Sequence, residues 1–290
     1  MSSVAFIGFG EAAQAFTGDQ AWKGRACAFD KLTDVPSTAA AKWQDYRGCG
    51  VLGTSNLADA VAESGLVLSL VTADQALLVA RDAALSVTNG AFYCDMNSVA
   101  PGTKGEAADA IESAGASYVD VAIMAPVRPG RLSVPLLISG TRAEAAAQRL
   151  EELGFSNVRA IGDRVGQASA IKMIRSVIIK GIEALTAEAM LAAEAAGVTK
   201  EVLASLDASD RQTQWQARAD YNLERMLVHG TRRSEEMLEV AKTLRELGVD
   251  PRMTGGAAAW QAEIGRLQIG PVADELGGKI TQIKGKAGRP

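Results

Sequence analysis

The stretch VAFIGFGEAAQAF, residues 4–16, joins a short apolar run to a pair of glycines and then to a helix-forming segment. The run VAFI is typical of a strand that is buried on both faces of a parallel sheet. Gly8 can make a tight turn, Gly10 leaves the backbone bare for a pyrophosphate, and Ala13 takes a third position where a small residue is needed. The helix that follows would point its N-terminus at the phosphate. The G-x-G-x-x-A pattern therefore predicts a dinucleotide-binding turn, and a plain glycine pair between a strand and a helix is the alternative.

An acidic residue follows the next predicted strand, at the spacing expected for a carboxylate that binds the adenosine ribose. The strand is ACAF, residues 26–29, and Asp30 ends it. A carboxylate at this place would repel the 2′-phosphate of NADP, so NAD is the favoured cofactor, although the neighbouring Lys31 softens that preference. The alternative role of Asp30 is that of a turn residue at a strand end.

The composition of the 290-residue chain limits the classes to which it can belong. A hydrophobic content of 48% suffices for two domains, and a net charge of −4 without an evident basic patch argues against a nucleic-acid partner. The apolar runs are shorter than the roughly 20 residues that span a bilayer, so no membrane partner is expected. Scattered cysteines and a single histidine predict reduced thiols and no metal site. The first strand leaves no room for a signal peptide, which predicts a cytoplasmic protein.

Short strands and helical stretches alternate through the first half of the chain. Strands are expected at 65–72, 91–98, 117–124, 133–140 and 157–163, and helices at 37–46, 56–64, 73–85, 101–114 and 140–153. This alternation predicts the α/β fold class, with a doubly wound (Rossmann) parallel sheet over residues 1–163 that ends in a hairpin-like addition.

The second half, residues 164–290, is predicted to be an all-helical substrate and dimerisation domain. It begins with a long interdomain helix over 168–197, about 45 Å long if continuous. Shorter helices are expected at 200–206, 209–228, 231–247 and 254–266. A long apolar helix of this kind commonly buries one face against a partner, so a homodimer is predicted.

Ligands of open parallel sheets bind beyond the carboxyl ends of the strands, and the residues just after each strand are therefore candidates. Asn97 and Ser98 follow one strand and could hydrogen-bond the nicotinamide side or a substrate hydroxyl, or else cap the helix near Pro101. The predicted cofactor-binding residues are Gly8, Phe9, Gly10, Glu11, Ala12, Ala13, Asp30, Lys31, Val71, Thr72 and Asn97.

Hydride transfer also needs a group that moves the hydroxyl proton. The candidate is Lys172, in the apolar SAIKMIRS at the start of the long helix, where burial beside a cleft would lower its pKa. Ser176 lies four residues on and shares the same helix face. In the alternative interpretation these residues and Lys180 form a polar stripe whose lysines snorkel along a helix edge.

The order of these motifs resembles that of the β-hydroxyacid dehydrogenase family, which includes relatives of 6-phosphogluconate and 3-hydroxyisobutyrate dehydrogenases. The resemblance rests on GFGEAA, DMNSVAP, YVDVAIMAP and GQASAIKMIRS, followed by a helical domain, and it covers nearly the whole chain. It implies that residues 95–98 are a substrate-binding segment and that residues 166–172 are the catalytic segment. Lys172 would then be the general acid/base.

Three departures from the family pattern concern substrate recognition. Ser176 stands where the family's helix usually has an asparagine, and a hydroxyl offers fewer hydrogen-bonding groups. Met124, Ala125 and Pro126 replace a serine-glycine-glycine loop, and Pro126 lacks the backbone N–H that would help to hold a carboxylate. A later lysine of the family is absent, and HGTRR, residues 229–233, occupies that region.

This basic segment could compensate for the lost loop. His229, Arg232 or Arg233 would hold an anionic substrate group, because guanidinium groups bind carboxylates bidentately. The alternative is a solvated basic turn that caps a helix.

The prediction is an NAD-dependent dehydrogenase, with NADP less favoured, that oxidises a β-hydroxyacid-like alcohol or reduces the matching carbonyl. Its catalytic residues would be Lys172, Ser176 and Asn97, and its substrate-binding residues Ser98, Met124, Ala125, Lys172, Ser176, His229, Arg232 and Arg233. Two rivals stay open. One is an imine reductase on the same fold, and the other is a nucleotide-binding sensor without catalysis, which the presence of Lys172 disfavours.

Overall fold

The computed structural model describes residues 3–18, 22, 24–209 and 214–287. The chain divides into two compact units, Met1–Met173 and Ile174–Pro290, which are described separately below. The predicted boundary at 163/164 lies before the long helix α7 (Gln167–Ala195), whereas the division falls within it. The first turns of α7 belong to the sheet unit because Ala168 packs in a buried cluster with Ala122 and Leu137.

The first unit alternates strands and helices along the chain. Its strands are β1 (Ser3–Ile7), β2 (Ala26–Phe29), β3 (Leu52–Gly53), β4 (Ser64–Ser69), β5 (Phe92–Asp95), β6 (Ser117–Ile123), β7 (Leu136–Ser139) and β8 (Val158–Gly162). Its helices are α1 (Glu11–Thr17), α2 (Pro36–Gly48), α3 (Leu57–Val61), α4 (Ala76–Ala84), α5 (Pro101–Ser113) and α6 (Ala143–Glu152), with short 3-10 turns η1 (Lys31–Thr33), η2 (Ala73–Gln75) and η3 (Arg131–Ser133).

The strands form one sheet in the order β3-β2-β1-β4-β5-β6-β7-β8. Neighbouring strands are parallel except for the antiparallel pair β6 and β7, which confirms the predicted doubly wound sheet with a hairpin-like addition. Ser69 of β4 pairs with Ile7 of β1 on one side and with Asp95 of β5 on the other. The carboxyl ends of these strands therefore meet at one edge. The two-residue strand β3 was not predicted, because so short a strand carries no readable pattern.

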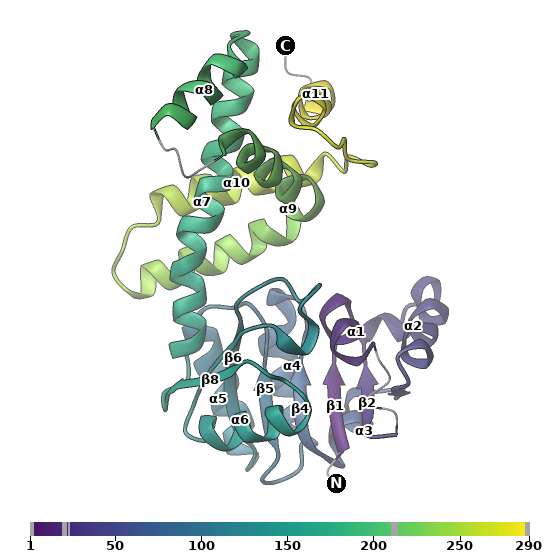
Figure 1. The fold of residues 1–290 in the computed structure, drawn as a ribbon. Coiled ribbons are helices and arrows are strands. Elements are labelled where there is room, and N and C mark those ends of the chain that lie inside the picture. The colour runs from purple at the N-terminus through teal and green to yellow at the C-terminus, as the bar shows by residue number, and fades with distance from the viewer. Residues whose placement is uncertain (1–2, 19–21, 23, 210–213, 288–290) are drawn as a thin grey trace. The chain divides into compact units, whose positions relative to one another are not determined.

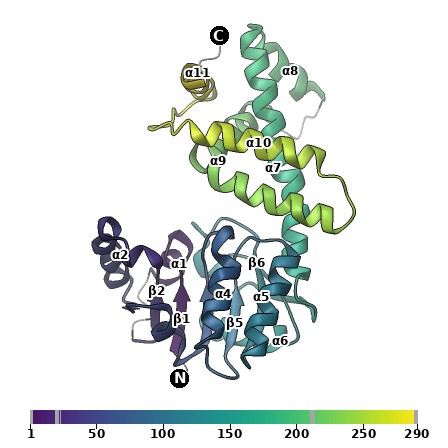
Figure 2. The same cartoon turned by 180° about the vertical axis from the view of Figure 1, so that it is seen from behind.

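Helices cover both faces of the sheet because the strands alternate their side chains between the two sides. Val4 and Phe6 of β1 belong to the core under α1 and α6. Ala5 and Ile7 belong to the opposite core, under α3, α4 and α5. Figure 1 shows α1 and α6 on one side of the sheet, and Figure 2 shows α4 and α5 on the other.

The second unit consists of helices, as predicted. After α7 come α8 (Thr199–Ser209), α9 (Trp215–Glu246), α10 (Arg252–Arg266) and α11 (Leu276–Ala287). The two predicted helices 209–228 and 231–247 are wrong, because α9 runs without a break through His229 and Gly230. Residues 210–213 of the first of these lie outside the described residues. Helix α11 was not predicted.

Gly230 does not interrupt α9. It allows a close contact between α9 and α10. A Cβ atom at this position would lie 2.5 Å from the backbone oxygen of Gln261 and 2.8 Å from the Cα of Gly265. Gly265 faces it in the same way, because a Cβ there would lie 2.3 Å from the backbone nitrogen of Thr231. The two glycines let the backbones of α9 and α10 touch.

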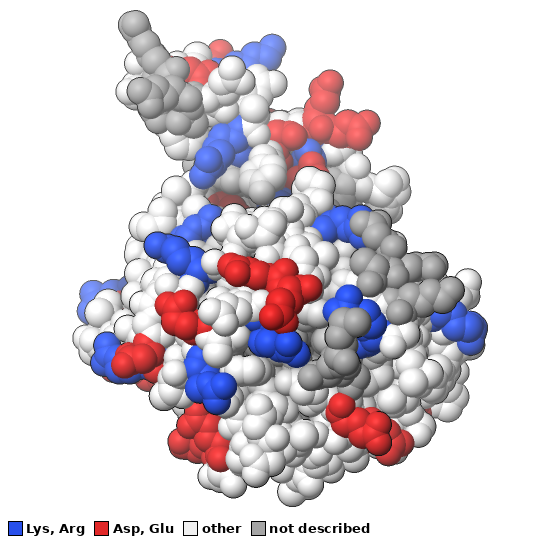
Figure 3. Space-filling model, turned by 60° about the horizontal axis from the view of Figure 1, so that its bottom comes forward, with Lys and Arg blue, Asp and Glu red and all other residues white. Residues whose placement is uncertain are grey.

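The surface carries charges of both signs. In the view of Figure 3, Lys and Arg side chains lie among Asp and Glu side chains. Within the described part of the chain, no helix has both the length and the apolar character that crossing a membrane requires.

We expect Gly230→Ala to lower the free energy of unfolding by about 1–3 kcal/mol, because the added methyl group overpacks the contact between α9 and α10. The matched control is Gly255→Ala in α10, where a Cβ would meet nothing within 4 Å. That change should raise stability by about 0.5–1 kcal/mol, since alanine favours a helix over glycine. Thermal unfolding followed by circular dichroism measures both, and equal midpoints for the two variants would contradict the close contact.

Candidate active site at the carboxyl edge of the sheet

The turn after β1 contains two glycines with different roles. The fold requires glycine at the first position, whereas the second glycine leaves open space beside the backbone. Gly8 has a φ of +81°, and a Cβ there would lie 2.4 Å from the backbone oxygen of Leu70. Gly10 is exposed, and a Cβ there would meet nothing within 4 Å. Ala13 is wholly buried against the core, as its predicted place requires. A ligand can therefore approach the backbone at Gly10.

The residue between these glycines is held through its backbone. Phe9 donates its N–H to Asp30 Oδ2 at 2.7 Å and accepts a hydrogen bond from Lys42 Nζ at 2.8 Å. Its ring is wholly buried between Phe6 and Tyr46. The ring of Phe9 belongs to the core and its N–H is bonded to Asp30, and a role of Phe9 in binding the cofactor stays a prediction. The sequence carried no signal for Lys42, which reaches the turn from α2.

Asp30 is fixed at the end of β2. Besides Phe9, the carboxylate accepts a hydrogen bond from the Leu32 backbone at 3.0 Å and caps η1. The side chain of Lys31 is exposed. The helix α1 begins at Glu11, and its N-cap residue Gly10 has no side chain that could cap the first N–H groups. The edge thus presents a fixed carboxylate and an uncapped helix N-terminus in the arrangement that a dinucleotide needs.

Asn97 ties the ends of β4 and β5 together. Its Oδ1 accepts from the Val71 backbone at 2.7 Å, and its Nδ2 donates to Asp95 Oδ1 at 2.7 Å and to Ser69 Oγ at 3.0 Å. Ala100, and not Asn97, holds the N-cap position of α5. These contacts make Asn97 a positioning residue for the strand ends. Thr72 follows Val71, is exposed and precedes η2.

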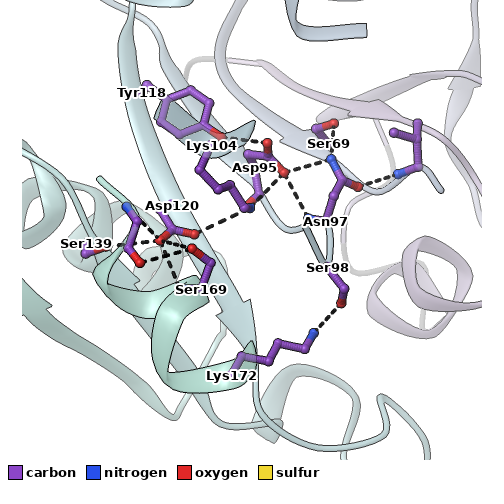
Figure 4. A network of polar contacts seen from close by, with 12 residues as sticks. Ser69, Asp95, Asn97, Ser98, Lys104, Tyr118, Asp120, Ser139, Ser169 and Lys172 are labelled. Carbon is purple, nitrogen blue, oxygen red and sulfur yellow. Dashed lines mark hydrogen bonds and ion pairs between the residues drawn. The ribbon is translucent and has the colours of Figure 1, made fainter. Parts of the chain in front are cut away.

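The structure brings Ser98 and Lys172 together from distant parts of the chain. Lys172 in the first turns of α7 donates from Nζ to Ser98 Oγ at 2.6 Å, as Figure 4 shows. Lys172 is partly buried, so it does not snorkel freely from a helix edge. After β6, Met124 is half-buried and donates its N–H to the Pro135 backbone, while Ala125 is exposed. Ser98 and Lys172 thus form a hydrogen-bonded pair at this edge.

A buried polar cluster, of which the sequence analysis named only residues of the segment 95–98, lies behind this pair. It consists of Ser69, Asp95, Asn97, Lys104, Tyr118, Asp120, Ser139 and Ser169. Figure 4 shows Lys104 between the two carboxylates. The single acidic residue in each of the strands β5 and β6 was the available signal, because an acid is seldom buried in a strand unless it is paired.

In the helical unit, the basic segment 229–233 does not form the predicted turn. His229, Arg232 and Arg233 lie inside the continuous helix α9 and do not form a capping turn. Arg233 is buried and makes a bidentate ion pair with Glu183 of α7, and its role in binding a substrate stays a prediction. Arg232 Nε lies 3.9 Å from Glu236. Roles for His229 and Arg232 in substrate binding stay predictions.

The polar stripe predicted along α7 continues into this second unit. Ser176 is buried, four residues after Lys172. Lys180 is buried and forms an ion pair with Glu236. Burial lowers the pKa of Lys180, and the charge of Glu236 opposes that shift. Lys180 is therefore an internally paired lysine. Among the described residues, no group of three or more His, Cys, Asp or Glu side chains could hold a metal ion.

Comparisons with known proteins extend over the whole chain. Residues 193–264 match the family model described as a domain of unknown function, DUF1932. A conserved hypothetical protein from Sinorhizobium meliloti 1021 is 38% identical, with a TM-score of 0.76, and the match covers 99% of this chain and 97% of that one. A conserved protein of unknown function, MTH1747, is 33% identical with a TM-score of 0.68, over 92% of this chain and 98% of that one, and it is described as structurally similar to 3-hydroxyacid dehydrogenases.

The same fold occurs in a solved structure that is named as a dehydrogenase. The 3-hydroxyisobutyrate dehydrogenase of Mycobacterium tuberculosis superposes with a TM-score of 0.72 over 98% of this chain and 99% of its own. The identity is 17%, so this match shows the shared fold alone.

The two glycines of the turn should respond differently to alanine. We expect Gly8→Ala to unfold the sheet unit at lower temperature, because a positive φ costs about 1–2 kcal/mol in alanine and the methyl group collides with Leu70. Gly10→Ala should keep its stability but bind NADH at least about tenfold more weakly, because the methyl group occupies the space of the pyrophosphate. Unfolding curves and NADH fluorescence titrations test this pair. Full NADH affinity in a folded Gly10→Ala protein would exclude the turn as the binding site.

Proposed function

This chain belongs to a divergent branch of the β-hydroxyacid dehydrogenase family, and we propose that it is a nicotinamide-dependent oxidoreductase. Its substrate would be a β-hydroxyacid-like alcohol or the matching carbonyl compound. The contact between Lys172 Nζ and Ser98 Oγ, 2.6 Å long, carries this proposal, because it puts a proton-moving group at the ligand-binding edge of the sheet. We also propose that the protein is a cytoplasmic homodimer.

The residues of the first unit fit a dinucleotide cofactor. Gly8 and Gly10 would form the pyrophosphate turn with Ala13 behind them, and Asp30 would bind the ribose hydroxyls. The uncapped first turn of α1 adds N–H groups and a positive partial charge for the phosphates. When bound, the nicotinamide group accepts or donates the hydride.

The chain itself would supply the proton chemistry. In the oxidising direction, the neutral amine of Lys172 would take the proton of the substrate hydroxyl, and in the reducing direction the ammonium group would return it. Ser98 accepts the hydrogen bond that holds Nζ in place, and it can donate its own hydroxyl proton to a substrate oxygen. Asn97 would position the strand end that carries Ser98.

We propose NAD as the preferred cofactor. Two backbone N–H groups, from Phe9 and Leu32, hold the Asp30 carboxylate in place. A fixed negative charge at the ribose would repel the extra phosphate of NADP.

We expect Asp30→Asn to raise the affinity for NADPH relative to NADH by about tenfold, because the amide removes the repelling charge. The two dissociation constants can be measured by fluorescence titration. Asp34→Asn, at an exposed acidic residue close by, is the control and should leave the ratio unchanged. An unaltered protein that already prefers NADPH would contradict the assignment.

An imine reductase is the second candidate, and the segment after β6 is the observation that favours it. Met124, Ala125 and Pro126 stand where the family holds a substrate carboxylate, and Pro126 offers no backbone N–H. A substrate without a carboxylate, such as a cyclic imine, would not need that loop. A sensor without catalysis would have no use for the Lys172 contact.

Lys172→Ala should slow turnover strongly while NADH binding persists, because the lysine contributes a proton and no cofactor contact. We expect a loss of roughly 10²–10⁴-fold in kcat against the best substrate of a panel of 3-hydroxy acids, 3-oxo acids and cyclic imines. Arg175→Ala, an exposed cation on the same helix, is the control and should keep its turnover. Undiminished turnover in Lys172→Ala would exclude its role, and turnover confined to imines would select the second candidate.

A further inference from the structure

A single lysine is completely buried between two carboxylates in the sheet unit. Lys104 of α5 has no exposed surface, and its Nζ lies 2.9 Å from Asp95 Oδ1 and 3.4 Å from Asp120 Oδ1. It also donates to the backbone oxygen of Asp95 at 2.6 Å. Asp95 and Asp120 are partners in the register of β5 and β6, so their Cα atoms are neighbours across the sheet.

Stability alone does not explain this cluster. Taking each ion out of water costs several kcal/mol, and buried ion pairs can often be replaced by apolar residues without a loss of stability. The three charges are therefore better understood through the groups that they hold in place.

The first of these groups is the beginning of α7. Asp120 Oδ2 accepts hydrogen bonds from the backbone N–H groups of Gly166 and Ser169 and from the Ser169 hydroxyl, at 2.9–3.1 Å. Lys172 follows Ser169 by three residues, less than one helical turn. Asp120 Oδ1 accepts no hydrogen bond from the described residues and faces the ammonium group of Lys104. The position of Asp120, and with it that of Lys172, depends on this cation.

The second group is the end of β5. Asp95 Oδ1 accepts from both the backbone and the side-chain nitrogen of Asn97, at 2.9 and 2.7 Å. Asp95 Oδ2 accepts from the Tyr118 hydroxyl at 2.6 Å. Burial, reinforced by the charge of Asp95, raises the pKa of Tyr118 well above its usual range, so the hydroxyl keeps the proton that it donates. Ser98 follows Asn97 directly, and its position depends on this carboxylate.

We propose that Lys104 is a positioning residue for the active site. By holding Asp95 and Asp120 together, it aligns the strand end that carries Ser98 with the helix start that carries Lys172. It touches neither substrate nor cofactor, since it is wholly buried. The catalytic consequence rests on the proposed function, whereas the alignment of Ser98 with Lys172 does not.

A double-mutant cycle tests whether Lys104 acts on Lys172 through Asp120. The variants are Lys104→Met, Asp120→Asn and the two combined, and the combination removes one charge of each sign, so it keeps the net charge of the cluster. The first readout needs no substrate. It is the rate at which acetic anhydride labels Lys172 in the folded protein, measured by peptide mass spectrometry relative to the exposed Lys31.

We expect both single variants to label Lys172 severalfold faster than the unaltered protein, because the amine leaves Ser98. The combined variant should label no faster than the faster single variant, since residues that act through one another are not additive. With an active substrate, kcat should fall by roughly 10- to 100-fold while the KM for NAD stays unchanged, because misplacement of the reacting group affects the chemical step.

Lys279→Met provides the control for the loss of any buried lysine. Lys279 is buried in the helical unit and pairs with Asp220 and Glu224, and its replacement should change neither the labelling of Lys172 nor kcat. If Lys104→Met does not fold, Asp120→Asn and the combined variant still give the comparison. Unchanged labelling in the folded variants, or additive effects, would overturn the proposal. Faster labelling in a protein that oxidises none of the panel would support the alignment and reject the proposed reaction instead.

Discussion

Two carboxylates lie opposite each other on neighbouring strands, and the geometry of the site depends on the cation between them. Asp95 and Asp120 are buried register partners, and like charges this close inside a protein cannot both persist without compensation. Lys104 supplies that compensation from α5. Each carboxylate then has oxygen atoms free to hold backbone, one at the end of β5 and one at the start of α7. The proposed alignment of Ser98 with Lys172 follows from these bonds.

In the glycine turn after β1, charged side chains likewise hold a backbone segment in place. Asp30 and Lys42 hold the backbone N–H and the backbone oxygen of Phe9 from opposite sides, while its ring anchors the turn in the core. Because these groups occupy Phe9, the bare backbone at Gly10 and the uncapped turn of α1 are what the sheet edge presents. The polar groups inside the fold are used to hold backbone segments, and the segments themselves form the site.

In the helical unit, tertiary contacts give some residues a structural role that differs from the role their local sequence predicts. Gly230 would break a helix by propensity alone, but α9 continues through it because the glycine lies against the backbone of α10. Arg233 has the chemistry of an anion-binding residue, yet Glu183 of α7 takes its guanidinium group. Gln261 of α10 also donates to Glu183, at 2.8 Å, so one carboxylate joins three helices.

The sequence by itself determined the features that depend on neighbours along the chain. The alternation of strands and helices, the glycine turn, the place of Asp30 and the apolar helix that carries Lys172 are all local patterns, which is why the doubly wound sheet and most of its edge could be predicted. The tertiary structure alone decided the contacts of Lys42, Lys104, Asp120 and Arg233, because their partners lie far away in sequence. From the sequence alone, a charged side chain is predicted to lie at the surface. Its ion-pair partner is distant in sequence, and only folding brings the two side chains together.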